Sequence, residues 1–271
     1  MKKVALVTGA SSGIGKETSK MLIADGYTVY VAARRLEKMA DLAQLGAHLV
    51  ELDLANDASI KKAVETLLAQ EQRVDVLVNN AGYGSYGALE DVPLEEAKYQ
   101  FEVNIFGLAR LTQLLLPTMR NQKSGRIINI SSIGGSFGEP HGAWYHATKF
   151  AVEGLSDSLR MELKQFGIDV VIIKPGAILT EWNGIAREHL LKTSGSTAYG
   201  ALAQKHVKML ADADNRGSLP SVVAKTILKA VRASKPKTRY ATGGGAHLIL
   251  FLRSILSDRL FDKLILALIK R

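Results

Sequence analysis

The sequence has no cysteine among its 271 residues, and this absence removes several kinds of chemistry at once. Without thiols the chain can form no disulfide, no cysteine nucleophile and no cysteine–zinc site, and we predict no metal site. A reducing compartment is compatible with this composition. Hydrophobic residues make up 47% of the chain and charged residues 23%, so an ordered protein with a substantial core is expected.

Long uncharged apolar runs are also missing. No stretch of about 18 apolar residues is free of charge, so we predict no membrane-spanning helix. The apolar run between Met1 and Thr8 is too short for a signal peptide and leads straight into glycines, as a first strand would. We therefore expect a cytoplasmic protein. Neither a linker nor an internal repeat divides the chain.

The net charge of +9 is distributed unevenly along the sequence. Residues Ser221 to Arg271 contain 11 basic and 2 acidic residues, so residues 1–220 balance to zero. Such an asymmetry suggests an acidic partner or an anionic membrane surface, and a solvated basic face explains it equally well.

Strand-like segments alternate with helical patterns along the chain. Most of the strand candidates are almost wholly apolar, which is typical of strands covered on both faces. We predict an α/β fold, a single Rossmann-type, doubly wound parallel sheet of about seven strands in the order 3-2-1-4-5-6-7 with helices on both faces. The expected strands are Val4–Thr8, Thr28–Ala32, His48–Glu51, Val74–Asn79, Arg126–Ser131, Val170–Lys174 and Arg239–Thr242. The expected helices include Gly15–Ala24, Ser59–Ala69, Leu94–Met119 and Tyr145–Phe166.

The first strand ends in a glycine-rich turn that opens a helix. Glycines allow a tight turn and a close backbone approach to a pyrophosphate, while the helix N-terminus offers free N–H groups and a positive dipole end. The spacing is Gly-x-x-x-Gly-x-Gly, which after a first strand indicates a dinucleotide site. The predicted contacts are Gly9, Ser11, Ser12, Gly13, Ile14 and Gly15.

The end of the second strand bears on the choice between NAD and NADP. An acidic side chain there would bind the ribose 2′-hydroxyl, whereas an arginine favours a 2′-phosphate. Neutral Ala33 stands where the acid is expected, and Arg34 follows with a forked guanidinium that suits a phosphate. We predict NADP(H) in preference to NAD(H). The alternative is that Arg34 and Arg35 are solvated charges at a helix start.

Further cofactor contacts are expected after the third and fourth strands. Asp53, which Leu54 follows, could accept a hydrogen bond from the adenine amino group. Asn80, Ala81 and Gly82 would border the adenine ribose. For the preceding residue, Asn79, we favour a structural role that ties the central strands together.

Three residues suggest acid–base chemistry near the fifth strand. Ser132 follows this strand, Tyr145 lies thirteen residues later and Lys149 four beyond that, which is one helical turn. A phenol is normally a poor acid or base near neutral pH, but a nearby ammonium favours the phenolate and lowers the pKa of the phenol. We predict that Tyr145 exchanges a proton with the substrate oxygen, while Ser132 hydrogen-bonds that oxygen.

Together these motifs resemble the short-chain dehydrogenase/reductase family over residues 1–245. The resemblance implies a catalytic tetrad of Asn104, Ser132, Tyr145 and Lys149, with Asn104 positioning a water in a proton relay. A helix irregularity satisfied by an amide is the alternative for Asn104. The resemblance also implies that Tyr145 and Lys149 contact the cofactor, that Pro175 and Gly176 border the nicotinamide, and that Thr180 binds its carboxamide.

Within this family the chain is similar to the 17β-hydroxysteroid dehydrogenase-like branch, which implies an apolar, lipid-like or steroid-like substrate. Candidate residues for an apolar pocket are Trp182, Trp144, Phe137 and Leu179, which could equally be packing residues. His141 and His146 flank the tyrosine and are interpreted as wall or surface residues.

The predicted organisation is a dinucleotide-binding and catalytic domain over residues 1–245 and a tail over residues 246–271. Residues 177–219 form a polar segment that follows the sixth strand, so we interpret it as a lid over the substrate. In the tail, a helix after Ser257-Asp258 would carry one apolar stripe with basic residues beside it. Packing over the substrate entrance, a dimer interface and membrane contact all remain open. The stripe consists of Leu260, Phe261, Leu264, Ile265, Leu268 and Ile269.

The leading functional prediction is an NADP(H)-dependent oxidoreductase that interconverts a carbonyl and an alcohol on an apolar small molecule. A β-ketoacyl thioester reductase is the alternative enzyme, and the basic face would then receive an acidic carrier protein. A non-catalytic NADP-binding regulator is the alternative of another class. Nucleic-acid binding is poorly supported, because the basic residues are not interleaved with aromatics. By resemblance we expect a homodimer or homotetramer built on the helices at Leu94–Met119 and Tyr145–Phe166.

Overall fold

The computed structural model describes residues 2–214 and 217–270. Its framework is one parallel sheet of seven strands in the order β3-β2-β1-β4-β5-β6-β7, as predicted. The order reverses between β1 and β4, and ligands of such sheets bind beyond the carboxyl ends of the strands at this point. The strands are β1 Val4–Thr8, β2 Thr28–Ala33, β3 His48–Glu51, β4 Val76–Asn79, β5 Gly125–Ile130, β6 Ile168–Pro175 and β7 Arg239–Thr242.

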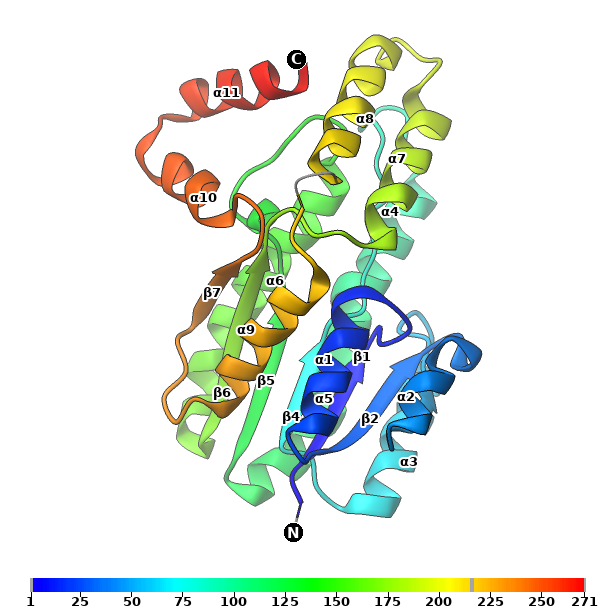
Figure 1. Ribbon diagram of the computed structural model, residues 1–271, viewed down its shortest axis with the longest axis vertical. Helices are drawn as coiled ribbons and strands as arrows, with labels where there is room; N and C mark the ends of the chain where they lie inside the picture. The colour runs from blue at the N-terminus through cyan, green and yellow to red at the C-terminus, as the bar shows by residue number, and fades with distance from the viewer. Residues whose placement is uncertain (1, 215–216, 271) are drawn as a thin grey trace.

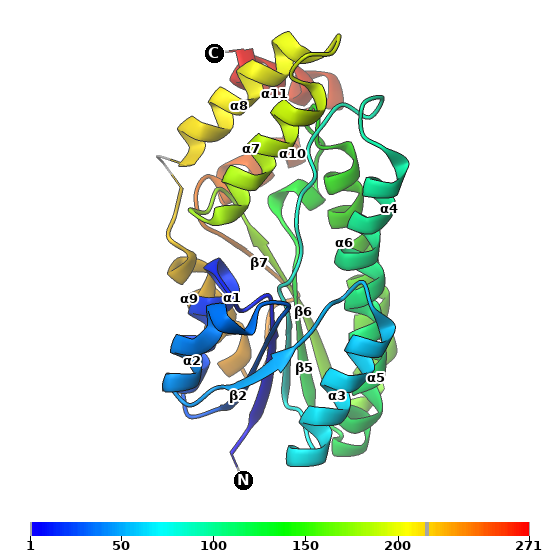
Figure 2. The ribbon, with the colours of Figure 1, turned by 90° about the vertical axis from the view of Figure 1, so that its right-hand side faces the viewer.

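Helices cover both faces of the sheet, as Figure 2 shows. On one face lie α1 (Gly13–Ala24), α2 (Ala40–Gln44) and α9 (Pro220–Arg232), and on the other α3 (Asp57–Glu71), α5 (Leu108–Gln122) and α6 (Ala143–Leu163). Each layer encloses its own apolar core against the strands. Because β1 is buried along its whole length, its residues are apolar on both faces, which explains the continuous apolar pattern in the sequence.

The predicted helix at Leu94–Met119 is three elements rather than one. Helix α4 covers Leu94–Phe101, a π-helical turn covers Glu102–Gly107, and α5 follows. The turn lets the backbone of Gly107 approach Leu54 so closely that a Cβ atom would collide with the Leu54 carbonyl oxygen. Shorter 3₁₀ turns cover Leu36–Met39, Ile133–Gly135 and Lys164–Phe166.

Four helices lie beyond the carboxyl ends of the strands (Figure 1). The segment predicted as a lid forms α7 (Glu181–Ser194) and α8 (Gly200–Asp214), and the tail forms α10 (Ala246–Ile255) and α11 (Asp258–Lys270). Residues 215 and 216 of the predicted lid, Arg271 of the tail and Met1 lie outside the described residues. Helix α11 packs on α8, so the tail closes over the lid.

The predicted apolar stripe of the tail lies on α11, and only part of it is buried. Phe261, Ile265 and Ile269 are buried, whereas Leu260 and Leu268 are 53% and 38% exposed. The buried residues pack against Phe137, which follows β5, and against partly buried residues of the lid. The periodicity of a helix shows which residues share its apolar face, but it does not show which of them other elements of the fold bury.

Candidate active site

A cavity of about 730 Å³ opens at the carboxyl ends of the central strands. It brings together the predicted cofactor and catalytic residues from the turn after β1, the ends of β2 to β6, α6 and the start of the lid. Gly15 and Asn104 do not line it. The predicted residues that do are Gly9, Ser11, Ser12, Gly13, Ile14, Arg34, Asp53, Leu54, Asn80, Ala81, Gly82, Ser132, Tyr145, Lys149, Pro175, Gly176 and Thr180.

The turn after β1 is shaped by a close backbone approach. Gly9 has φ +65°, and a Cβ atom on it would lie 2.8 Å from the Ala81 Cα atom. The Asn80 amide donates to the carbonyl oxygens of Thr8 and Gly9 at 3.0 and 3.2 Å and so fixes the turn against β4. Gly15 serves the packing of α1 on this turn, because a Cβ atom there would collide with the Gly9 carbonyl. The resulting cradle fits a pyrophosphate at the N-terminus of α1.

Arg34 lies at the cavity rim, exposed to solvent after β2. Its guanidinium donates a hydrogen bond to the Tyr99 hydroxyl at 3.2 Å, which holds the side chain across the mouth. The neutral Ala33 beside it leaves this end of the cavity without the carboxylate that an NAD ribose would engage. Asp53 also lines the cavity, where its Oδ1 accepts a hydrogen bond from the Ala55 N–H at 3.0 Å.

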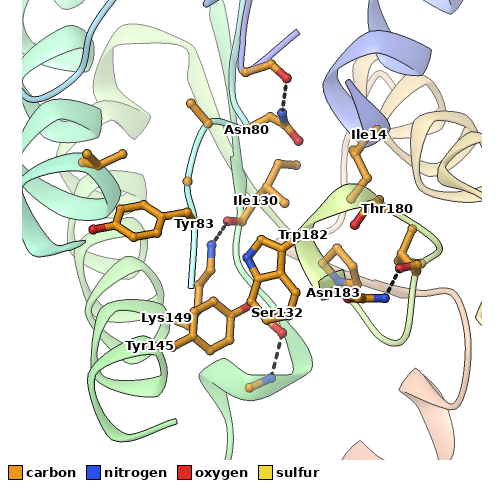
Figure 3. A pocket seen from close by; sticks show the side chains of 18 of the residues that line it. Ile14, Asn80, Tyr83, Ile130, Ser132, Tyr145, Lys149, Thr180, Trp182 and Asn183 are labelled. Carbon is orange, nitrogen blue, oxygen red and sulfur yellow. Dashed lines mark hydrogen bonds between the residues drawn. The ribbon is translucent and has the colours of Figure 1, made fainter. Parts of the chain in front are cut away.

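The residues predicted to transfer a proton, Tyr145, Lys149 and Ser132, lie close together in the cavity (Figure 3). Helix α6 places Tyr145 and Lys149 one turn apart, with the Lys149 Nζ atom 5.8 Å from the centre of the Tyr145 ring. That ammonium donates to the Ile130 carbonyl oxygen at 3.0 Å, at the end of β5. The Ser132 hydroxyl oxygen accepts from the Gly134 N–H at 3.0 Å, so its own hydrogen is free to point elsewhere.

The electrostatics of Tyr145 differ from the prediction. Burial raises the pKa of Tyr145 to about 12, opposed by the Ser132 hydroxyl and reinforced by the negative charge of Glu139. Lys149 is not among the groups that shift this pKa, so the predicted lowering by its ammonium is not seen for the protein's own groups. Burial in turn lowers the pKa of Lys149 to about 8, with Glu153 acting in the opposite direction.

Asn104 lies in the π-helical turn and is buried. Its Oδ1 accepts from the Tyr83 N–H at 3.1 Å, and its Nδ2 donates to the Tyr83 carbonyl at 2.9 Å and to the Thr148 hydroxyl at 3.2 Å. These bonds tie the loop after β4 to α6. These contacts are those expected if the Asn104 amide stabilises a helix irregularity. Its role in a proton relay through water stays a prediction.

Aromatic side chains form one wall beside Tyr145. Trp182 of the lid lies 5.1 Å from the Tyr145 ring and 5.8 Å from the Tyr86 ring, centre to centre, and Phe137 completes the wall. Two of the four pocket candidates fall elsewhere. Trp144 packs edge-on against Phe101 because it faces the other side of α6, and Leu179 is 37% exposed.

The two histidines beside the tyrosine have different positions. His146 lines the cavity and contacts the Gly134 carbonyl through Nδ1 at 2.8 Å. His141 is buried behind the wall, where its Nδ1 lies 3.1 Å from the Nδ1 of His206 on α8. The interpretation as wall or surface residues therefore holds for His146, which is part of the cavity wall, and neither histidine lies on the surface.

Sequence reasoning missed several residues that line the cavity. Tyr83 and Tyr86 follow the Asn79–Gly82 segment directly, so their place at a strand end could have indicated them. Glu139 lies in a short loop with no periodic pattern, and nothing in the sequence connects it with His206, which is 67 residues away. Over residues 2–214 and 217–270 no group of three potential metal ligands gathers, and no helix there is long and apolar enough to cross a membrane.

The sheet order, the glycine turn and the Tyr–Lys–Ser constellation define a nicotinamide-dependent oxidoreductase of the Rossmann type. Residues 3–190 match the family model of the short chain dehydrogenases. The chain therefore belongs to the short-chain dehydrogenase/reductase family.

Relatives of known sequence match almost the whole chain. It is 36% identical over 261 residues to a probable short-chain type dehydrogenase/reductase, VdlC, of Helicobacter pylori, covering 96% of both proteins. It is 35% identical to the 3-ketodihydrosphingosine reductase of Bacteroides thetaiotaomicron, covering 93% of this chain and 91% of the relative. It is 34% identical to the NADPH-dependent 3-dehydrocapnine reductase of Ornithobacterium rhinotracheale, covering 97% and 95%.

Solved structures show the same fold with bound cofactors. A short-chain dehydrogenase from Streptomyces avermitilis superposes with a TM-score of 0.81 at 37% identity, covering 94% of this chain and 93% of the other. A variant of actinorhodin polyketide ketoreductase with NADPH gives 0.78 at 31% identity, covering 90% and 97%. The 3-ketoacyl-(acyl-carrier-protein) reductase of Brucella melitensis with NADH gives 0.75 at 28% identity, covering 90% and 98%. Similar proteins thus bind either nicotinamide dinucleotide.

Proposed function

We propose that this protein is an NADP(H)-dependent reductase of apolar, lipid-like or steroid-like carbonyl compounds that can also run as an alcohol dehydrogenase. The observation that carries the proposal is the single cavity that holds Tyr145, Lys149 and Ser132 at one end and Arg34 at the other. No member of the family tetrad is replaced, which argues against a non-catalytic regulator.

The proposed chemistry divides the work between cofactor and chain. Bound NADPH supplies the hydride. Tyr145 is protonated at neutral pH, because its pKa is about 12, and so it can donate a proton to the developing alkoxide. Ser132 can donate a hydrogen bond to the same oxygen and hold the carbonyl in place, since its acceptor site is already used by Gly134.

Lys149 has an electrostatic part in this proposal. Its ammonium is anchored to the Ile130 carbonyl and faces the Tyr145 ring, so it favours negative charge on the tyrosine oxygen after proton transfer. In the oxidation direction Tyr145 must lose its proton first. There the high pKa imposed by burial is an obstacle that the positive charge of the oxidised nicotinamide would oppose.

The cofactor preference rests on Arg34. The guanidinium donates a hydrogen bond to Tyr99 at the cavity rim. The preceding residue is the neutral Ala33, where an NAD-binding site would have an acidic residue. A forked guanidinium binds a phosphate through two parallel hydrogen bonds, whereas a ribose 2′-hydroxyl gains little from it. We therefore propose that NADP(H) is preferred to NAD(H).

The substrate class rests on the walls of the cavity. Tyr86, Phe137, Trp182, Met209 and Leu210 line the region around Tyr145 and favour an apolar chain or ring system. The names of two relatives describe reduction of 3-ketodihydrosphingosine and of 3-dehydrocapnine, which supports ketone reduction as the direction.

A β-ketoacyl thioester reductase is the second candidate. The similarity to a 3-ketoacyl-(acyl-carrier-protein) reductase favours it, and the excess of basic residues would suit an acidic carrier protein. The thioester substrate would enter the same cavity and use the same proton donor, so the two candidates differ in substrate alone.

The deciding experiment is NADPH consumption by the purified protein over a carbonyl panel. The panel contains steroid, retinoid and long-chain ketones, 3-ketodihydrosphingosine, β-ketoacyl thioesters and small polar ketones. Turnover confined to apolar ketones supports the proposal, and a preference for thioesters supports the second candidate. Binding of NADPH without turnover of any compound would contradict both.

We also propose that the protein works as a homo-oligomer in the cytoplasm. Phe106, Phe150 and Met161 lie on or beside the helices expected to pair, and they are 56%, 49% and 69% exposed. Leu248, Phe251 and Ile255 form a second exposed apolar stripe on α10, which keeps membrane contact open as an alternative use of the tail. Light scattering after size-exclusion chromatography tests for the homo-oligomer, and flotation with anionic vesicles tests for membrane contact.

A further inference from the structure

The cavity contains a carboxylate that the proposed reaction does not use. Glu139 lies in the loop between β5 and α6, and its side chain is only 16% exposed. It lines the cavity together with its neighbours Tyr86 and His146. The other two acids of the cavity wall, Asp53 and Glu96, have partners in the loop after β3 and at Tyr83. Glu139 is thus the acid of the wall that flanks the catalytic tyrosine.

All close contacts of this carboxylate converge on one oxygen atom. The Tyr86 hydroxyl donates to Oε1 at 2.8 Å. The Nε2 atoms of His146 and His206 lie 3.7 and 3.8 Å from the same Oε1, beyond hydrogen-bond distance. Within residues 2–214 and 217–270, the hydrogen bond to the Glu139 side chain goes to Oε1 and none goes to Oε2. A carboxylate has room for about four hydrogen bonds, so most of its capacity is unused.

The charge of Glu139 is retained despite its burial. Burial raises the pKa of Glu139, but His146, His206 and the Tyr86 hydroxyl together more than compensate, so the pKa lies below its ordinary value. Burial lowers the pKa of His146, yet Glu139 raises it above the ordinary value overall. Burial lowers the pKa of His206, so this histidine is neutral at physiological pH. An ionised carboxylate whose Oε2 accepts no hydrogen bond from the chain can pair with a cationic group of a ligand in the cavity.

Glu139 and Tyr145 are linked by a shared neighbour. The Tyr86 ring lies 5.7 Å from the Tyr145 ring and its hydroxyl binds Glu139, so the carboxylate stands one aromatic side chain away from the proton donor. A substrate whose carbonyl meets Tyr145 can therefore place a second group of the same molecule near Glu139. The apolar wall formed by Phe137, Trp182 and Met209 surrounds the remainder.

We infer that Glu139 is a recognition site for a cationic amino group on the substrate, which makes long-chain amino ketones the preferred substrate class. This inference rests on the proposed reduction of apolar ketones. A primary ammonium carries the opposite charge to the carboxylate and has three hydrogen-bond donors. It can therefore donate a charge-assisted hydrogen bond to Oε2. A plain ketone of the same length leaves Oε2 unpaired.

The test is calorimetric binding of octylamine and of 1-octanol to the NADP⁺-saturated protein at pH 8, where the amine is protonated and the chain lengths match. We expect the wild type to bind octylamine at least about tenfold more tightly than octanol, as one charge-assisted contact implies. Equal affinities for the two ligands in the wild type would overturn the inference without any variant.

Three variants locate the preference. Glu139→Gln should remove it, Glu139→Asp should retain part of it, and Glu188→Gln, on the exposed side of α7 and away from the cavity, should leave it unchanged. A preference that survives Glu139→Gln would contradict the assignment to this residue. Thermal unfolding of each variant shows that it is folded. Because binding needs no turnover, inactivity on the ketone panel would refute the proposed function separately from this inference.

Discussion

Burial is the largest influence on the pKa of Tyr145, and the nearby negative charge of Glu139 acts in the same direction. The sequence shows that a lysine lies one turn from Tyr145, but it does not show how much water either side chain loses. The pKa of Tyr145 therefore rises to about 12 while that of Lys149 falls to about 8. A protonated phenol can donate a proton, which is the part that the proposed carbonyl reduction assigns to Tyr145.

Replacing Tyr145 by phenylalanine should remove the proton donor and little else. We expect kcat for NADPH-dependent reduction to fall about 10²- to 10⁴-fold, with NADPH affinity nearly unchanged, because the ring still packs against Trp182. Steady-state kinetics and a fluorescence titration of NADPH measure the two quantities. Wild-type turnover in this variant would exclude Tyr145 as the acid.

The pH dependence of reduction should follow Lys149. Its ammonium is present below its pKa of about 8 and is lost as the pH rises through that value, whereas Tyr145 keeps its proton up to about 12. We therefore expect kcat for reduction to decline above about pH 8. A Lys149→Arg variant that keeps measurable activity should lack this decline, because its guanidinium stays charged. A wild-type profile that is flat from pH 7 to 10 would contradict this assignment.

Arg34 provides a prediction about the cofactor. Arg34→Ala removes the guanidinium, so the affinity for NADPH should fall about 10- to 100-fold, the range for hydrogen bonds to a charged group. The affinity for NADH should stay almost unchanged. Calorimetric titration with each dinucleotide measures both values, and NADH is the internal control for a disturbed fold. Equal losses for the two would refute contact with the 2′-phosphate.

At the scale of elements, the sheet was predictable because buried parallel strands have a nearly continuous apolar pattern. The predicted ends of β1, β3 and β7 coincide with the observed ones. Strand β4 begins at Val76 and not at Val74, and just before it the Asp75 carboxylate accepts a hydrogen bond from the Val4 N–H at 2.7 Å, at the amino end of β1. The lid helices α7 and α8 were not predicted, since their polar sequence shows no clear helical stripe.

The π-helical turn between α4 and α5 agrees with the helix irregularity offered as the alternative for Asn104, but its physical cause could not be predicted from the sequence. It depends on contact between Gly107 and Leu54, residues that no local pattern connects. The same limit applies to the site. Motif spacing identified the residues that follow strands, whereas Glu139 and His206 meet only because the lid folds back over the loop after β5.

Gly107→Ala tests the packing of this turn. The added methyl group would collide with the Leu54 carbonyl, so we expect a loss of about 1–3 kcal/mol in the free energy of unfolding. Gly154→Ala is the matched control, because Gly154 is exposed within α6 and a Cβ atom there meets nothing within 4 Å. That substitution should be neutral or stabilise the protein by up to about 1 kcal/mol. Urea denaturation measures both, and similar effects at the two positions would contradict the packing argument.

At the scale of the whole molecule, segments far apart in the sequence meet around one cavity. The turn after β1 and the ends of the strands line it together with the lid, and the tail packs behind one of its wall residues, Phe137. Phe261 of α11 lies 5.2 Å from the ring of Phe137, which itself lines the cavity. The tail therefore supports the substrate wall from behind without reaching the cofactor.

This arrangement predicts that damage to the tail affects substrate and cofactor differently. Phe261→Ala removes a buried ring, so the protein should lose about 3–5 kcal/mol of stability. Because Phe137 then loses its support, KM for an apolar ketone should rise while the Kd of NADPH stays the same. Leu260→Ala, at the neighbouring exposed position, should change stability by no more than about 0.5 kcal/mol and leave KM unaltered. If Phe261→Ala weakened the binding of NADPH as much as that of the ketone, the substitution would have distorted the whole cavity. That result would contradict a role of the tail in supporting the substrate side alone.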